Sequence, residues 1–137
     1  MKIKKAHTLL AGFCALSLAH SAPVQLIFDT DMGNDVDDAL ALAMVHSLQS
    51  LGECKLLAVT TNKDNPYSLL LVDVINTFYG RGDIPIGAVK NSGVTPEDGR
   101  FAKQVCERVD GDGNFIYART HKTGDVFPEA SALLREL

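Results

Sequence analysis

Over residues 24–89, short apolar segments of the length of a β-strand alternate with longer segments whose apolar residues have the spacing of an α-helix. The residue pattern predicts three strands, at 24–28, 55–61 and 84–89, and the first of them is expected to be buried. Apolar residues three and four positions apart predict helices between them, at 37–51 and 66–79. Alternation of this kind favours parallel strands joined by helices. We therefore predict an α/β fold: an open, mostly parallel sheet with flanking helices.

Large apolar residues recur at helical spacing in both predicted helices. The first helix carries Leu40, Met44, Leu48 and Leu51, and one face of the second carries Leu71, Val74, Ile75 and Phe78. Beyond Asn91, glycine and proline interrupt the pattern and predict a loop-rich region before a short helix at 128–137. At most three strands are predicted, so we expect an incomplete domain.

Acidic residues gather where the first strand should meet the first helix. Five carboxylates lie within ten residues: Asp29, Asp31, Asp35, Asp37 and Asp38. Such like charges repel one another, and oxygen-only ligands select calcium or magnesium over zinc. The carboxyl ends of parallel strands are also the usual ligand site in open α/β sheets. The cluster therefore predicts a site for a hard cation, although helix capping alone explains one or two of these aspartates.

The stretch from Asp29 to Leu42 resembles the signature of the inosine-uridine-preferring nucleoside hydrolases, Asp-x-Asp-x-Gly-x-Asp-Asp-Ala-x-Ala-Leu. Here the glycine is Gly33, and two extra residues separate it from the Asp-Asp pair. Either Asp35 or Asp37 could therefore take the role of the first aspartate of that pair. The phase into the helix favours Asp37. The segment 57–65 also resembles the second-strand motif of the family.

The resemblance implies calcium-dependent hydrolysis of the N-glycosidic bond of ribonucleosides, giving ribose and a free base. By it, Asp31 and Asp38 would bind Ca²⁺ and Asp37 would be the general base. Asn65 would contact the substrate, with Asp29 and Asp35 in support. It also implies nucleoside catabolism as the biological role and a homo-oligomeric protein.

Two other functions remain open from the residues alone. The later calcium ligands and base contacts of the family have no counterpart in this chain, which leaves room for a catalytically inactive nucleoside-binding remnant. A strand ending in Asp-x-Asp also begins the site of haloacid-dehalogenase-like phosphatases, although Gly33 departs from that motif. Asn65 has a structural alternative as well, because it precedes Pro66 as a helix cap would.

Residues 1–21 have the pattern of a bacterial signal peptide, with Lys2, Lys4 and Lys5 before an apolar stretch. We expect cleavage after Ser21, export to the periplasm or medium, and one mature domain at 22–137. Losing three lysines and no acids moves the formal charge from −4 to −7. An acidic chain without a basic stripe argues against nucleic acid as a partner, and no mature segment predicts a membrane span.

For four remaining features the sequence predicts no functional role. The segment 110–114 (Asp-Gly-Asp-Gly-Asn) lacks the EF-hand glutamate and predicts a turn. His46 is expected to pack within the first helix, and no role is assigned to His121. Cys54 and Cys106 could pair or remain buried thiols.

Overall fold

The computed structural model describes residues 22–90 and 99–137 of the chain. Residues 1–21, including the predicted leader, lie outside the described part. The elements in chain order are β1 (Val24–Thr30), α1 (Asp37–Ser50), β2 (Cys54–Thr61), α2 (Pro66–Phe78), β3 (Ile86–Ala88), α3 (Arg100–Cys106), a 3₁₀ turn η1 (Gly124–Val126) and α4 (Ala130–Glu136).

The three strands form one parallel sheet in the order β1-β2-β3. Val24 lies opposite Cys54 and Thr30 opposite Thr61, with a register shift between Leu26 and Ile27. All strands therefore end at the same edge of the sheet. The α/β class, the parallel sheet and the flanking helices are confirmed.

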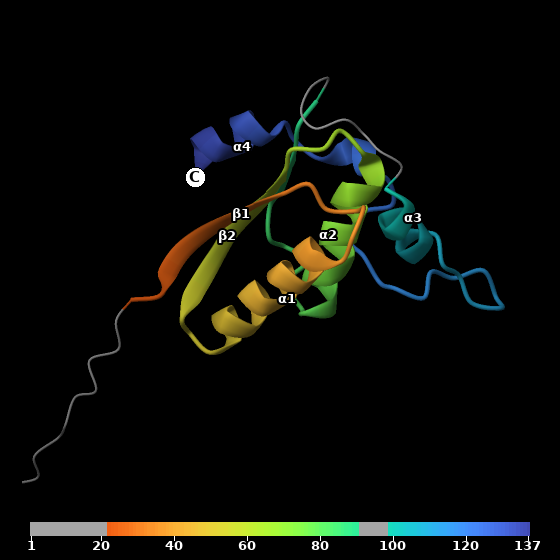
Figure 1. Cartoon of the computed structure of the whole chain (residues 1–137), viewed down its shortest axis with the longest axis horizontal. Helices are drawn as coiled ribbons and strands as arrows, with labels where there is room; N and C mark the ends of the chain where they lie inside the picture. Colours follow the sequence, from red (N-terminus) through yellow and green to blue (C-terminus); the bar gives the residue numbers. More distant parts are fainter. Residues whose placement is uncertain (1–21, 91–98) are drawn as a thin grey trace, which may run out of the picture.

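Helices cover the two faces of the sheet unequally. Figure 1 shows α1 and α2 together on one side of the strands and α4 on the other. Successive strand residues point to opposite faces, and Ile86 and Ala88 belong to the core, so Gly87 faces α4. A Cβ on Gly87 would lie 2.9 Å from the Ala130 Cα. The missing side chain therefore allows α4 to pack closely on β3.

The prediction that the first strand is buried is wrong. Val24 is 65% exposed and Ile27 is 41% exposed. Within the described residues β1 pairs with β2 alone, so it is an edge strand. Its side chains facing away from α1 also remain open to solvent, because α4 packs over β3.

Helix α1 is present as predicted, but its apolar repeat does not mark the core. The buried residues are Leu42, Val45 and His46. The repeating residues are between 39% and 72% exposed, namely Leu40, Met44, Leu48 and Leu51. On α2, Leu71 and Val74 are buried as a core face should be, whereas Phe78 is 81% exposed at the last turn.

The region after the sheet contains one helix that the glycine and proline pattern conceals. Helix α3 packs against α2 through the buried Ala102 and Cys106. The 110–114 segment is a turn as predicted, since the Asp110 amide donates to the Asn114 carbonyl at 2.9 Å. Cys54 and Cys106 are both free, buried thiols.

Within residues 22–90 and 99–137 no helix has the length and apolar character needed to cross a membrane.

Candidate functional site

The loop between β1 and α1 is held in place by two buried hydrogen bonds and by the close packing of Gly33. The Thr30 hydroxyl accepts from the Met32 amide at 3.0 Å, and the Ser68 hydroxyl of α2 donates to the Met32 carbonyl at 2.5 Å. Gly33 has a φ of +133°, which an L side chain rarely adopts, and a Cβ there would lie 3.3 Å from Ala102. Because Met32 is buried and its neighbour Asp31 is exposed, this loop presents the Asp31 carboxylate to solvent.

Asp31 and Asp38 are brought together from the two ends of this loop. The Asp38 carboxyl hydrogen-bonds the side chains of Thr30 and Asp31. Partial burial raises the pKa of Asp38, and the neighbouring Asp31 and Asp37 charges raise it further, against the lowering effect of Thr30. Two carboxylates in contact form a concentrated negative charge that a cation would relieve.

Asp35 and Asp37 form a second carboxyl pair on the exposed surface beside α1. The hydrogen bond to Asp37 raises the pKa of Asp35, and the charge of Asp37 raises it further. The same hydrogen bond, together with the Asp38 backbone amide at 2.9 Å, lowers the pKa of Asp37. The contact between the two carboxyl groups therefore moves their pKa values apart, with that of Asp35 raised and that of Asp37 lowered.

Asp29 supports the carboxyl end of the sheet from the side. Its carboxylate accepts from the Thr60 hydroxyl at 2.6 Å and from the Asn62 side-chain amide at 3.2 Å. Both partners belong to β2 or the loop that follows it. Asp29 thus links the ends of two neighbouring strands.

Asn65 is the N-cap of α2. Its Oδ1 accepts from the Tyr67 amide at 2.9 Å, and Pro66 occupies the first helical position. Gly99 packs closely against it, since a Cβ on Gly99 would lie 3.1 Å from the Asn65 Nδ2. This oxygen is therefore engaged in helix capping, the structural alternative expected for the residue.

The donor set can be compared with what calcium requires. Oxygen ligands from Asp31 and Asp38 suit a hard cation, but calcium takes six to eight oxygens. Within residues 22–90 and 99–137 no group of three or more His, Cys, Asp or Glu side chains could hold a metal ion. The described residues thus supply an acidic pair and no complete metal cage.

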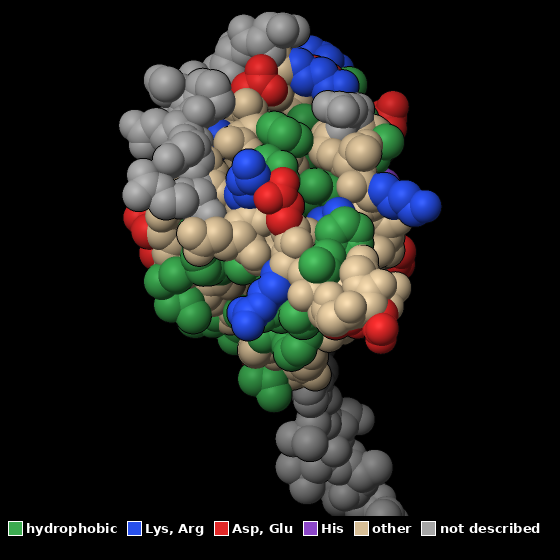
Figure 2. Space-filling view, turned by 90° about the vertical axis from the view of Figure 1, so that its right-hand side faces the viewer, with side chains coloured by type: hydrophobic (Ala, Val, Ile, Leu, Met, Phe, Trp, Pro, Cys, Tyr) green, Lys and Arg blue, Asp and Glu red, His purple; other side chains and the backbone are tan. Residues whose placement is uncertain are grey.

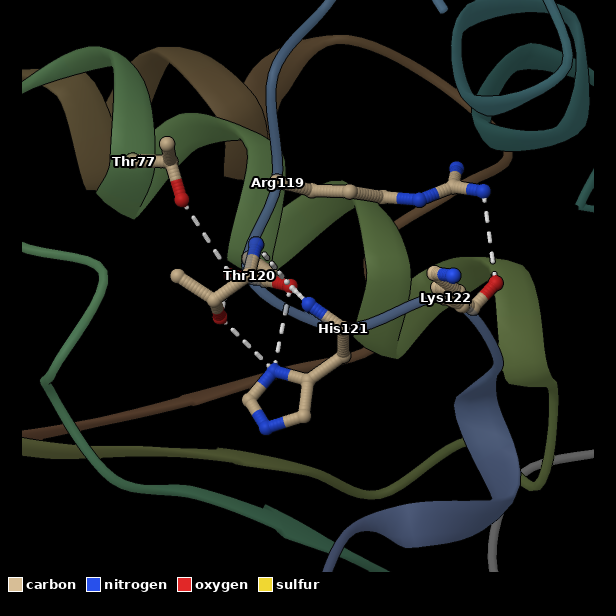
Figure 3. Close-up of polar contacts among 6 residues, drawn as sticks. Thr77, Arg119, Thr120, His121 and Lys122 are labelled. Carbon is tan, nitrogen blue, oxygen red and sulfur yellow. Dashed lines mark hydrogen bonds and ion pairs between the residues drawn. The ribbon is translucent and has the colours of Figure 1, made fainter.

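The structure contains a buried polar cluster around Asp73 that the sequence analysis did not predict. Figure 3 labels its partners Thr77, Thr120 and His121. Asp73, on α2, is fully buried. Its carboxylate accepts from the Thr120 amide and hydroxyl at 3.0 and 2.7 Å, and from the His121 amide at 2.7 Å. The Thr77 hydroxyl adds a contact at 3.3 Å and the His121 Nδ1 another at 3.1 Å. A single aspartate inside the apolar run of α2 is the sequence signal for such a cluster.

The surface also carries an apolar groove of about 730 Å³ between α1, α2 and the segment 116–118. Leu40, Phe78 and Tyr117 are among its lining residues, and none of the lining residues in the described part of the chain is charged. Figure 2 shows hydrophobic side chains reaching the surface in several groups on one face of the molecule. Because the acidic residues of the candidate site do not line this groove, its chemistry is separate from theirs.

Comparisons with known proteins gave no match among family models, curated proteins or solved structures.

Proposed function

We propose that this chain hydrolyses the N-glycosidic bond of ribonucleosides with the help of a bound calcium ion. One observation carries the proposal: the carboxyl groups of Asp31 and Asp38 meet at the carboxyl end of a parallel sheet. That edge is where open α/β sheets bind ligands. The motif from Asp29 to Leu42 adds the resemblance to nucleoside hydrolases. On this resemblance we also propose that the α/β fold is of the nucleoside hydrolase type.

In this proposal Asp31 and Asp38 hold the ion, which would lower the pKa of water and orient it. Asp37, an exposed carboxylate at the start of α1, accepts the proton of the attacking water. Asp35 keeps that carboxylate hydrogen-bonded, and Asp29 fixes the neighbouring strand ends. Asn65 contacts the substrate from the α2 N-terminus.

The proposed reaction adds water across one bond. The oxygen of the water bonds to the anomeric carbon while the C–N bond breaks through an oxocarbenium-like state. The electron pair of that bond leaves with the base, which takes up a proton, and Asp37 later releases the proton it accepted. No covalent intermediate with the protein is required.

The test is release of free ribose from inosine and uridine by the purified chain, with calcium or with a chelator. We expect release that requires calcium and falls at least about 100-fold in Asp37→Asn, the usual range for loss of a general base. Asp83→Asn, an exposed aspartate between α2 and β3, is the matched control and should keep full activity. Calcium-independent release, or equal loss in both variants, would contradict the proposal.

A second function is favoured because no group of three or more His, Cys, Asp or Glu side chains that could hold a metal ion occurs in the described part of the chain. Under it the chain binds a nucleoside without turning it over. Calorimetric binding of inosine by a folded chain that releases no ribose would support this alternative. A role in nucleoside catabolism and homo-oligomer formation belong to the same family-based proposal. Export to the periplasm or the medium is proposed from the leader pattern of residues 1–21.

A further inference from the structure

His46 is a buried titratable residue that the proposed reaction does not use. It lies on the inward side of α1, its exposed fraction is 0%, and its ring stacks on Tyr79 with centroids 4.7 Å apart. Tyr79 caps the C-terminal end of α2. The ring therefore sits between the two helices that cover one face of the sheet.

Both ring nitrogens of His46 have hydrogen-bond partners, and these partners determine which nitrogen carries the proton of the neutral ring. The Arg81 Nη1 lies 3.2 Å from Nδ1, and the Asn76 Oδ1 lies 2.8 Å from Nε2. A guanidinium can only donate, so Nδ1 must accept and carry no proton. Nε2 then holds the proton of the neutral ring and donates it to Asn76.

Arg81 also connects the ends of the two helices. Its Nη1 donates to the His46 carbonyl at 3.1 Å, and its Nη2 donates to the Ser50 hydroxyl at 2.8 Å. Its backbone amide donates to the Asn76 carbonyl at 2.8 Å. The side chain and the backbone amide of Arg81 thus join the last turns of α1 to the end of α2.

The surroundings of the ring oppose a positive charge. Burial lowers the pKa of His46, and the Arg81 charge lowers it further, although the hydrogen bond to Asn76 acts the other way. Arg81 is the charged group that faces the ring, and Tyr79 is the titratable group from α2. From β2 the Cys54 thiol donates to the carbonyl of Val45, the residue before His46, at 3.6 Å.

We propose that His46, Ser50, Asn76 and Arg81 form an acid-sensitive latch between α1 and α2. Protonation places an N–H on Nδ1 against the Arg81 guanidinium, which removes the hydrogen bond and sets two positive charges side by side. The latch then opens at the C-terminal end of α1. Since the same helix begins with Asp37 and Asp38, acidification loosens the element that carries the acidic site.

The direction of the pH effect follows from linkage. The folded pKa of His46 lies below the unfolded value of about 6.5, so the unfolded state binds the proton more tightly. The stabilisation is complete above the unfolded pKa and is lost as the pH falls from it toward the folded pKa. One such group raises the unfolding equilibrium constant by at most about tenfold per pH unit.

The first measurement is an NMR titration of the histidine ring signals in the unaltered chain. We expect His46 to titrate below 6.5, and Arg81→Gln to move that titration toward 6.5. A His46 that titrates at or above 6.5 in the unaltered chain would overturn the latch. This readout requires no nucleoside, so its failure is distinguishable from failure of the proposed hydrolase activity.

The second measurement is urea unfolding at pH 7, 6 and 5. The unaltered chain should lose stability with acid more steeply than His46→Gln, whose side chain does not titrate. The control is His121→Gln, at the half-exposed histidine beside Asp73. This variant should keep the part of the acid-dependent loss of stability that comes from His46. Equal pH slopes for the unaltered chain and His46→Gln would contradict the proposal. If His46→Gln does not fold, the NMR comparison with Arg81→Gln decides.

Discussion

Helices α1 and α2 occupy equivalent places after β1 and β2, but they are buried to different extents. Helix α2 is buried without interruption from Ser68 to Val74. Helix α1 is buried only along Leu42, Val45 and His46. The spacing of large apolar residues therefore predicts that a segment is helical, but the neighbouring elements determine which side of the helix is buried.

The neighbours of the two helices account for the difference. Helix α2 packs against α1, α3, β3 and the 3₁₀ turn η1, so it has partners on several sides. Helix α1 packs against β2 and α2. Its second apolar side, which includes Leu40 and Met44, faces solvent and the rim of the apolar groove.

The largest effect should come from removing the buried charge on α2. Asp73→Ala leaves two backbone amides and the Thr120 hydroxyl without their acceptor. We expect a loss of about 3 to 5 kcal/mol in the free energy of unfolding, measured by urea titration followed by circular dichroism. Asp83→Ala, at an exposed aspartate, should stay within about 0.5 kcal/mol. Similar losses in both variants would show that the Asp73 contacts do not anchor α2.

The next effect separates the two sides of α1 with the same substitution in the same helix. Leu42→Ala opens a cavity at a fully buried position and should cost about 3 kcal/mol. Leu40→Ala removes a side chain that is mostly in solvent and should change stability by less than about 0.5 kcal/mol. Helix propensity cancels between the two variants, so the difference reports burial alone. Equal costs would mean that the outward side of α1 is covered in solution.

Strand and helix order could be predicted from the sequence because each element depends on its own residues. The ends of α1 and α2 lie within one residue of the predicted ends. Burial of the first strand could not be predicted this way, since it depends on which strands pair with β1. Helix α3 was also missed, because its contacts with α2 stabilise a short segment that lies among glycines.

The candidate site also has features that the sequence could predict and features that depend on the tertiary fold. Local spacing after an apolar strand was enough to single out the acidic cluster, and the family resemblance selected Asp31 and Asp38 from it. The fold brings these two side chains into contact. The opposite pKa shifts of Asp35 and Asp37 depend on side-chain geometry that spacing does not contain. Two partners of Asp73, Thr120 and His121, lie 47 and 48 residues away. Only the tertiary fold joins them to α2, so the lone aspartate signals a buried polar group but does not identify these partners.

The smallest effect tests where the burial of α2 ends. Phe78 and Val74 lie one turn apart, and Phe78 is 81% exposed while Val74 is 6% exposed. Val74→Ala should cost about 2 kcal/mol, whereas Phe78→Ala should cost less than about 0.5 kcal/mol despite removing the larger side chain. Urea unfolding of both variants measures the difference. A costly Phe78→Ala would mean that this ring is buried in solution, and the contrast between the helices would then lie in what covers the apolar groove.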